Sequence, residues 1–347
     1  MNKKKSVALI ADVKNWSFDI DAHLMKRAIE NEFKVDIFYS KEYPLNGDFY
    51  KIINAVKDYD IIYFFWRKDL LPITEEKIRK EIEKMGINVK DFVNKVATGI
   101  YDHLYIEESN YIDLLNNYCK KYIVSSNILY TIYCKNDKIK NPDCILTDTF
   151  DEEIFYPQNL KRFNKKNDEE LVLGWVGNST WYSKKGIDFK GYNTIYKPVC
   201  DKIISEGYKI KCFDADRRIK LIPQNEMRLY YSRIDIYICV SKEEGTPRPL
   251  MEAMGCGIPI ITTDVGVARQ YLGNIQKKYI IGCRENEKKD EEIKIRLKDR
   301  ILKLYNNRNL LTVLSKENYE NSKKINFLAY KEKYCDFFKR FWYEKSY

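Results

Sequence analysis

The sequence of 347 residues predicts an α/β protein with two doubly wound domains, each built on a parallel sheet. Short apolar runs alternate with segments of helical periodicity along most of the chain, and this alternation is typical of strand–helix–strand units. A polar stretch at 159–170, NLKRFNKKNDEE, interrupts the alternation and has no apolar face, which indicates a linker. The length also suits two domains.

The first domain, residues 1–160, begins with a short apolar run that stops at Asp12 and is predicted to be a strand. The segment after it has helical periodicity, and the next one alternates as a half-buried strand does. The run that ends at Trp66 is apolar almost throughout, as in a strand buried on both faces. The predicted elements are strand Ser6–Ala11, helix Asp21–Glu32, strand Lys34–Tyr39, helix Tyr50–Lys57, strand Asp60–Trp66, a helical region Thr74–Asn94, and strands Val96–Ile100 and Tyr122–Val124.

The second domain, residues 161–325, repeats the alternation of strands and helices. Pro249 suits the first position of a helix, where the missing N–H is not needed for a hydrogen bond. The predicted elements are strand Glu170–Val176, helix Thr194–Glu206, strand Tyr208–Phe213, helix Asn225–Ser232, strand Ile234–Val240, a helix start at Pro249–Met254 and strand Pro259–Thr263. The segment Arg284–Tyr347 is dense in Lys and Glu and is expected to be largely helical.

Residues 326–347 are predicted to form a terminal helix rich in aromatic side chains. A helix that carries Phe337, Phe338, Phe341 and Trp342 must pack against an apolar surface. Two alternatives stay open, because the helix can pack on the second domain or cross back to the first.

Composition limits the classes of protein to which this chain can belong. Hydrophobic residues make up 44%, which argues against wholesale disorder, and apolar runs such as Ile61–Trp66 are far shorter than the roughly 18–20 residues that span a bilayer. The basic start, Met1–Lys5, precedes an apolar run that is too short for a secretory signal. The scattered cysteines form no CxxC pair, so neither a zinc site nor a disulfide framework is indicated. We therefore expect a cytoplasmic protein.

The charge of the chain favours anionic partners without choosing among them. The 61 Lys and Arg residues outnumber the 51 Asp and Glu residues, which gives a formal net charge of +10. Such a protein is attracted to polyanions, which include nucleic acid, anionic lipid and nucleotides. An evenly spread, solvated surface explains the same excess equally well.

The most informative stretch is Ser241–Gly266, SKEEGTPRPLMEAMGCGIPIITTDVG. Glu244 follows the predicted strand Ile234–Val240, and Glu252 is expected in the first turn of the next helix. The N–H groups at a helix N-terminus bind phosphate, and carboxylates accept hydrogen bonds from vicinal hydroxyls. The segment therefore suits a nucleotide-sugar, although a bare pair of glutamates more often complements a helix dipole or lies on the surface.

The same stretch resembles the C-terminal signature of the family four glycosyltransferases, which are retaining enzymes with the GT-B fold. The signature is Glu–x7–Glu within an EG…LEAM-x-G-x-P-V-I pattern, and the EGTPRP sequence here resembles a subgroup version of the loop. The residues in register are Glu244, Gly245, Glu252, Ala253, Met254, Gly257, Pro259, Ile260 and Gly266. The resemblance implies two Rossmann-like domains facing a cleft, the N-terminal one binding the acceptor and the C-terminal one the nucleotide-sugar.

The resemblance also implies roles for individual residues. Glu244 is expected to be catalytic and to contact the hydroxyls of the donor sugar, and Glu252 is expected to bind the ribose. Backbone N–H groups at the helix start are expected to face the diphosphate, which makes donor-binding residues of Gly245, Thr246, Arg248, Pro249 and Leu250. Pro247 stands where many members have Gly, so one backbone donor is lost, and Arg248 is expected to compensate electrostatically.

A second stretch, Leu171–Gly191, resembles the family's strand that ends in a glycine turn and leads to a Lys–Gly pair near the donor phosphates. Gly177 fits the turn, and Asn178 stands near the place where an Arg is often found. Both Lys185 and Lys190 precede a glycine and are candidates to contact the diphosphate. The sequence after Lys190 leads into a helix as the family pattern does, which favours Lys190 as the catalytic cation that stabilises the leaving group.

The N-terminal half resembles the family less closely. After the first strand, the family often has a glycine-rich loop, but this chain carries Asp12, Trp16 and Asp19 there, which we expect on the acceptor side. His103 lies in TGIYDHLY after a strand, where the family places an active-site histidine. It is the third catalytic candidate, although a lone histidine is more often structural.

The resemblance thus implies a retaining, hexosyltransferase-like glycosyltransferase. It would move a sugar from a nucleotide-sugar to a hydroxyl of a bacterial glycan, a lipid-linked saccharide or a glycoprotein. Electrostatic stabilisation of the diphosphate is expected to drive the reaction without a metal or another cofactor. Part of the net charge is expected to hold the protein peripherally at the inner face of an anionic membrane, and nucleic acid is not the expected partner.

Two alternative functions stay open. Patterns of the DxD type at Asp19–Asp21, Asp58–Asp60 and Asp214–Asp216 are of the kind that holds a divalent cation in metal-dependent GT-A glycosyltransferases. A nucleic-acid-binding or DNA-modifying protein is compatible with the net charge and the 28 tyrosines, although the sequence shows no helix-turn-helix or RNP signature.

Overall fold

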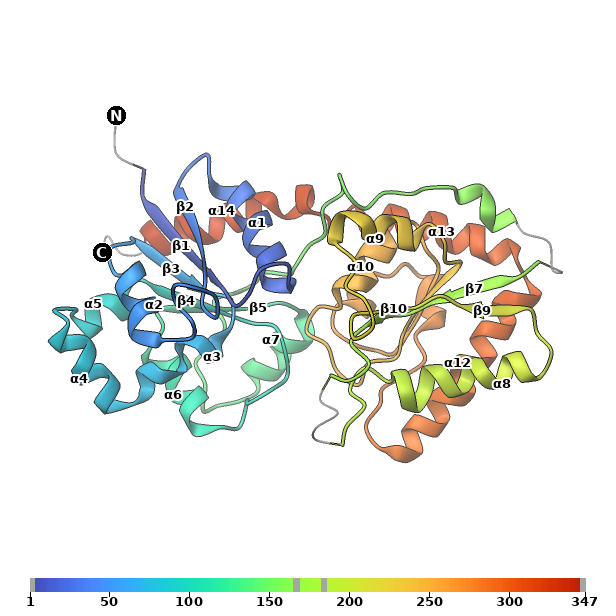
Figure 1. Cartoon of the computed structure of the whole chain (residues 1–347), viewed down its shortest axis with the longest axis horizontal. Coiled ribbons are helices and arrows are strands. Elements are labelled where there is room, and N and C mark those ends of the chain that lie inside the picture. Colours follow the sequence, from blue (N-terminus) through green and yellow to red (C-terminus); the bar gives the residue numbers. More distant parts are fainter. Residues whose placement is uncertain (1–3, 165–168, 182–185, 344–347) are drawn as a thin grey trace. The chain divides into compact units, whose positions relative to one another are not determined.

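The computed structural model describes residues 4–164, 169–181 and 186–343, and the chain divides into two compact units (Figure 1). Unit 1 comprises Met1–Asp148 and Tyr330–Tyr347, and unit 2 comprises Thr149–Ala329. The chain therefore leaves unit 1 after Asp148, before the boundary at 160 that the sequence suggests, and its C-terminal segment belongs to unit 1. Every helix in the described ranges is too short or too polar to span a bilayer.

Unit 1 is built on a six-stranded parallel sheet with the strand order β2-β1-β3-β4-β5-β6. Its strands are β1 (Ser6–Ala11), β2 (Lys34–Tyr39), β3 (Ile61–Phe64), β4 (Val96–Ile100), β5 (Lys121–Val124) and β6 (Cys144–Ile145). Its helices are α1 (Ser17–Ile29), α2 (Phe49–Val56), α3 (Arg67–Leu70), α4 (Glu76–Lys84), α5 (Val89–Val93), α6 (Ser109–Asn117), α7 (Asn127–Cys134) and α14 (Phe327–Tyr343).

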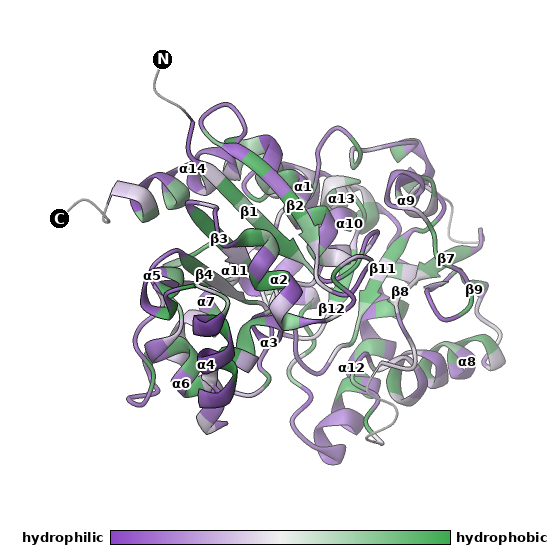
Figure 2. Ribbon diagram, turned by 60° about the vertical axis from the view of Figure 1, so that its left-hand side comes forward, coloured by the Kyte–Doolittle hydropathy of each residue, from purple (hydrophilic) through white to green (hydrophobic). Residues whose placement is uncertain are grey.

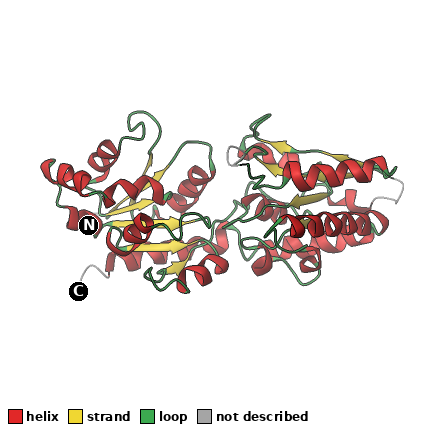
Figure 3. Ribbon diagram, turned by 90° about the horizontal axis from the view of Figure 1, so that it is seen from below, coloured by secondary structure: helices red, strands yellow, loops and turns green. Residues whose placement is uncertain are grey.

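The central strands of unit 1 are buried on both faces, which is why they are largely apolar, and β3 is apolar throughout. Ile62 and Phe64 of β3 join the core that α2, α4, α6 and α7 cover. The next residue along, Tyr63, points to the other face and packs against Phe337 and Phe338 of α14, with ring centroids 6.2 and 6.1 Å away. The strands thus lie between two layers of helices, as the secondary-structure colours of Figure 3 also show.

The aromatic face of α14 packs within unit 1. Phe338 also contacts Phe33, with ring centroids 6.3 Å apart, and the Tyr334 hydroxyl donates to the carbonyl oxygen of Thr147 at 2.9 Å. Phe338 and Phe341 are fully buried there. The sequence left open whether this helix packs on the second domain or on the first, and these contacts correspond to packing on the first.

Unit 2 has a four-stranded parallel sheet, β12-β11-β7-β9, and a short parallel pair, β10-β8. Its strands are β7 (Leu171–Gly174), β8 (Val176–Gly177), β9 (Ile210–Cys212), β10 (Ala215–Asp216), β11 (Ile236–Cys239) and β12 (Ile260–Thr262). Its helices are α8 (Lys197–Ser205), α9 (Gln224–Tyr231), α10 (Arg248–Gly255), α11 (Ala268–Tyr271), α12 (Glu287–Asn306) and α13 (Asn309–Ser322). Figure 2 shows the strands of this sheet as largely hydrophobic, whereas α12 carries hydrophilic residues along its length.

The described start of the polar stretch, residues 159–164, is structured, although the sequence indicates a linker there. Leu160–Asn164 forms a 3₁₀ turn, and Phe163 within it is only 1% exposed. Arg162 donates to the carbonyl oxygens of Tyr231 and Ile234 at 3.2 and 3.1 Å. A single buried aromatic is invisible to a periodicity argument, which explains why the sequence analysis assigned no structure to this stretch.

Candidate active site

The loop between β11 and α10, together with the first residues of α10, carries most of the predicted donor-binding residues. It is fixed from the side of β12, because the Thr263 hydroxyl donates to the carbonyl oxygen of Ser241 at 2.7 Å. Gly266, at φ +52°, lies directly against it, since a Cβ atom there would come within 2.6 Å of the Gly245 carbonyl oxygen and of the Pro247 ring. The glycine of the sequence motif is therefore needed for close approach of two backbones.

Lys190 and Glu244 form an ion pair at this loop. Nζ of Lys190 lies 2.5 Å from Oε1 of Glu244, although the two residues are 54 positions apart. Their side chains are 25% and 15% exposed, so the pair is largely buried and only partly solvated. This contact joins two predicted catalytic residues, whereas Lys185, the other candidate, falls outside the described residues.

The Lys190 loop lies directly against the end of β11. The Lys242 N–H donates to the carbonyl oxygen of Phe189 at 2.8 Å, which ties the two loops together by backbone. Gly191 has φ +68°, and a Cβ atom on it would lie 2.3 Å from the Val240 carbonyl oxygen. Position 191 therefore requires glycine for two reasons, the left-handed backbone conformation and the lack of space for a side chain.

Glu252 lies deeper than the sequence analysis predicts. It is the fifth residue of α10, beyond the first turn, and it is 4% exposed. Burial raises its pKa from 4.5 to about 7, against the opposing effects of the Arg248 charge and a hydrogen bond from Tyr231. The expectation that Glu252 lies in the first turn is wrong, because Arg248 rather than Pro249 begins the helix and the first turn contains no acidic residue.

The Tyr231 hydroxyl connects Glu252 to the start of α10. It lies 2.9 Å from Oε2 of Glu252 and 3.1 Å from the carbonyl oxygen of Pro249. A hydroxyl has one proton and cannot donate to both acceptors at once. The Tyr231 hydroxyl therefore links the carboxyl of Glu252 to the backbone at the start of α10.

Arg248 is buried, with only 7% of its surface exposed. Its Nη1 donates to the carbonyl oxygen of Thr149 at 2.7 Å, and its charge opposes the rise in the pKa of Glu252. These contacts give Arg248 a structural function in unit 2, and its compensation for Pro247 stays a prediction. Thr246, Pro249 and Leu250 lie at the helix start as predicted from the motif.

The turn after β8 contains Gly177 and Asn178. A Cβ atom on Gly177 would lie 2.7 Å from the Trp175 ring, and Oδ1 of Asn178 accepts from the Thr180 N–H at 3.0 Å. The next residue, Ser179, donates from its hydroxyl to Asp216 at 2.6 Å. The side chains of Asn178 and Ser179 thus hold this turn through hydrogen bonds, within the turn and to β10.

One DxD pattern lies beside this turn and is engaged in hydrogen bonds. Asp214 accepts from the hydroxyls of Tyr192 and Tyr196 at 3.1 and 2.6 Å, and burial raises its pKa. Asp216 accepts from Ser179, as described above. Among the described residues, no group of three or more His, Cys, Asp or Glu side chains is placed to hold a metal ion.

The predicted acceptor-side residues lie in and next to the loop between β1 and α1 in unit 1. Asp12 accepts a hydrogen bond from the Val13 N–H at 2.9 Å, and Trp16 precedes α1 with 37% of its surface exposed. Asp19 accepts from the Tyr39 hydroxyl at 2.6 Å and lies 3.3 Å from the His23 imidazole. Trp16 is thus partly exposed, whereas the contacts of Asp19 stabilise the fold.

His103 lies in the loop after β4, also in unit 1. The loop is held by Arg67, which is 2% exposed and donates to the carboxylate of Asp102 at 2.6 Å and to the carbonyl oxygen of Leu104 at 2.5 Å. Arg67 therefore fixes the residues on both sides of His103.

Sequence reasoning missed three buried residues that bind predicted site residues or their near neighbours in the chain, namely Arg67, Tyr231 and Arg284. None stands in a motif that the sequence analysis identified. The one available signal is chemical, because tyrosine and arginine are common donors, but the chain contains too many of both for that signal to select these three.

Comparison with known sequences assigns part of unit 2. Residues 217–321, which include Glu244 and Glu252, match the model of the family Glycosyl transferases group 1. Protein CapJ of Staphylococcus aureus is 25% identical over a match that covers 33% of this chain and 35% of CapJ. The chain thus matches about a third of the length of this curated relative. The family match over residues 217–321 agrees with the Glu–x7–Glu resemblance, whereas the EGTPRP subgroup stays a prediction.

Comparison with solved structures shows the fold of nearly the whole chain. The Anabaena protein Alr3699/HepE, in complex with UDP and glucose, has a TM-score of 0.66 at 13% identity, covering 97% of this chain and 100% of that one. Sucrose-phosphate synthase from Thermosynechococcus elongatus has a TM-score of 0.63 at 14% identity, covering 97% and 99%. Both are GT-B structures with two Rossmann-like domains, which confirms the predicted fold class and makes the GT-A alternative wrong.

Proposed function

We propose that this protein is a glycosyltransferase that moves a sugar from a uridine diphosphate sugar to a hydroxyl of a glycan, a lipid-linked saccharide or a protein, with retention of anomeric configuration. The observation that carries the proposal is the ion pair of Lys190 and Glu244, at 2.5 Å, beside the start of α10. The family match over residues 217–321 supports the reaction class. The UDP bound in Alr3699/HepE supports the choice of uridine.

The ion pair combines the two kinds of group that recognise a sugar diphosphate. The Lys190 ammonium attracts phosphate oxygens, and the Glu244 carboxylate accepts hydrogen bonds from sugar hydroxyls. Because the two side chains touch, a donor that binds both must place the bond between its anomeric carbon and its phosphate oxygen beside them. That bond is the one that transfer breaks.

In the proposed reaction, the bond from the anomeric carbon to the diphosphate breaks, and its electron pair leaves with UDP. Lys190 and the N–H groups at the start of α10 stabilise the charge that develops on the diphosphate. The acceptor oxygen bonds to the anomeric carbon on the face that UDP leaves, and its proton passes to a phosphate oxygen of UDP. The configuration is therefore retained, and no metal ion is required.

The remaining site assignments follow from the same proposal. Unit 1 supplies the acceptor-binding residues Asp12, Trp16 and Asp19, and His103 acts near the donor sugar. Gly177 and Asn178 form part of the donor site in unit 2. Peripheral association with an anionic membrane, where a lipid-linked acceptor is found, completes the proposal and rests on the net charge of +10.

UDP is expected to raise the melting temperature of the protein by several degrees, because a ligand at about 100 times its dissociation constant stabilises the native state by about 2.7 kcal/mol. The measurement is a thermal-shift series with UDP, GDP, CDP and ADP, each with and without EDTA. UDP should give the largest shift, and EDTA should leave it unchanged. A larger shift with another nucleotide would overturn the choice of uridine, and a shift lost in EDTA would restore a metal-dependent site.

The transferred sugar is expected to keep the anomeric configuration that it has in the donor. Proton NMR of the product formed early in the reaction measures this, because the coupling constant of the anomeric proton differs between the two configurations. An inverted product would contradict the mechanism in which UDP takes the acceptor proton.

A further inference from the structure

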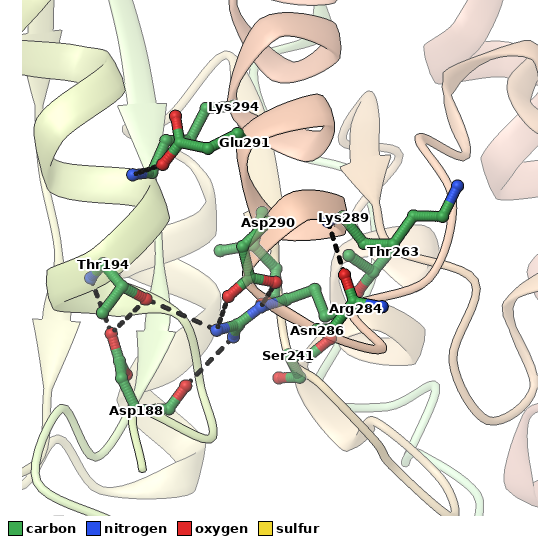
Figure 4. A network of polar contacts seen from close by, with 11 residues as sticks. Asp188, Thr194, Ser241, Thr263, Arg284, Asn286, Lys289, Asp290, Glu291 and Lys294 are labelled. Carbon is green, nitrogen blue, oxygen red and sulfur yellow. Dashed lines mark hydrogen bonds and ion pairs between the residues drawn. The ribbon is translucent and has the colours of Figure 1, made fainter. Parts of the chain in front are cut away.

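Arg284 is a buried arginine, and Figure 4 shows its guanidinium among Asp188, Thr194 and Asp290. It lies shortly before α12 and is 6% exposed. Its guanidinium forms a two-pronged contact with Asp290, from Nε to Oδ1 at 3.0 Å and from Nη2 to Oδ2 at 2.9 Å. A buried cation needs such pairing, and the planar fork of arginine matches a carboxylate.

The remaining donor atoms of Arg284 bind the two loops that carry the ion pair. Nη1 donates to the carbonyl oxygens of Asp188 and Val240, each at 3.0 Å. Asp188 stands two residues before Lys190, and Val240 directly follows β11, the strand that leads to Glu244. One guanidinium therefore ties together the backbones on which both charged side chains depend.

The far side of the Lys190 loop is held by the same network. Nη2 of Arg284 lies 3.4 Å from the Thr194 hydroxyl, and Oδ2 of Asp188 accepts from the Thr194 N–H at 2.7 Å and from its hydroxyl at 3.0 Å. A Cβ atom on Gly191 would lie 2.7 Å from Nη1 of Arg284, so the loop presses directly on the guanidinium. Residues before and after Lys190 are thus fixed by one side chain and its partners.

We infer that Arg284 is a positioning residue, which holds the Lys190 loop so that the lysine ammonium lies at Glu244, where the donor diphosphate binds. The inference rests on the proposed function, because the positioning matters only if Lys190 contacts the donor. Arg284 acts through Lys190 and does not touch the donor. Lysine cannot replace it, since an ammonium lacks the rigid fork that reaches Asp290, Asp188 and Val240 together.

The test is a double-mutant cycle read by UDP binding. We expect Lys190→Ala to raise the dissociation constant of UDP about tenfold, the effect of losing one charge-assisted contact. Arg284→Lys should raise the dissociation constant of UDP by up to about tenfold. The double variant should have a dissociation constant no more than about tenfold above that of the parent, because both changes remove the same contact. The matched control is Arg296→Lys on α12, whose Nη1 donates to the Ile281 carbonyl oxygen at 3.2 Å and which should leave UDP binding unchanged.

Hydrogen exchange of the unliganded protein separates positioning from the proposed function. In Arg284→Lys, the amides of residues 186–196 should exchange faster than in the parent, while those of β12 should not. Unchanged exchange, or additive losses in the cycle, would overturn the assignment of Arg284. If the parent protein does not bind UDP but Arg284→Lys still loosens residues 186–196, the proposed donor fails and the structural clamp stands.

Discussion

Replacing Glu252 with glutamine is expected to weaken UDP binding strongly while leaving the protein at least as stable as the parent at pH 8. The pKa of Glu252 is raised by burial from 4.5 to about 7, so the native state holds this proton more tightly than the unfolded chain does. The stabilisation from the neutral carboxyl is complete below pH 4.5 and is lost as the pH rises through about 7. It amounts to about 3 kcal/mol at most.

Glutamine has no charged form and keeps the shape of the neutral carboxyl. The Glu252→Gln variant should therefore keep this stabilisation as the pH rises. Thermal scans at pH 5.5 and pH 8 should show a steeper decline in the parent than in the variant. Glu226→Gln, an exposed change on α9, is the control and should leave the decline as it is in the parent. A variant that melts lower than the parent at both pH values would show that the Glu252 carboxylate is needed for folding.

The second large effect is expected from Lys190→Ala and Glu244→Gln, which should each reduce transfer by a factor on the order of 10²–10³. Loss of the ammonium removes a cation from the place where charge develops on the leaving diphosphate. Loss of the carboxylate charge weakens the contact with the sugar hydroxyls. The measurement is kcat and KM for transfer from the donor that the nucleotide screen identifies.

The same two variants should change the melting temperature little. The Lys190–Glu244 pair is 25% and 15% exposed, and partly solvated ion pairs contribute roughly 0–1 kcal/mol to stability. Lys197→Ala, which breaks the ion pair with Asp201 on α8, provides a control with a similar change of charge and should leave transfer intact. Full activity in Lys190→Ala on the identified donor would remove Lys190 from the site.

The sequence predicts the strands better than the helix starts. Strands Ser6–Ala11, Lys34–Tyr39 and Val96–Ile100 have the predicted bounds, because an apolar run and an alternating pattern are both local features of the sequence. Helix α1 starts at Ser17, ahead of the predicted Asp21. Its first turn is fixed by distant partners, since the Phe18 ring packs on Tyr101 with centroids 5.1 Å apart.

What the sequence by itself determined is the local part of the site. The Glu–x7–Glu spacing and the strand–loop–helix context of Glu244 and Glu252 are properties of one continuous segment, and the Glycosyl transferases group 1 match covers that segment. Such features depend on backbone geometry over a few residues, which local residue types encode.

Only the tertiary structure decided which charges meet. Three features depend on how separate elements pack: the contact of Lys190 with Glu244 across 54 positions, the burial that raises the pKa of Glu252, and the convergence of Arg284 on Asp188 and Val240. A side chain's partner and its solvation are set by residues far away in the chain, and no short pattern records them.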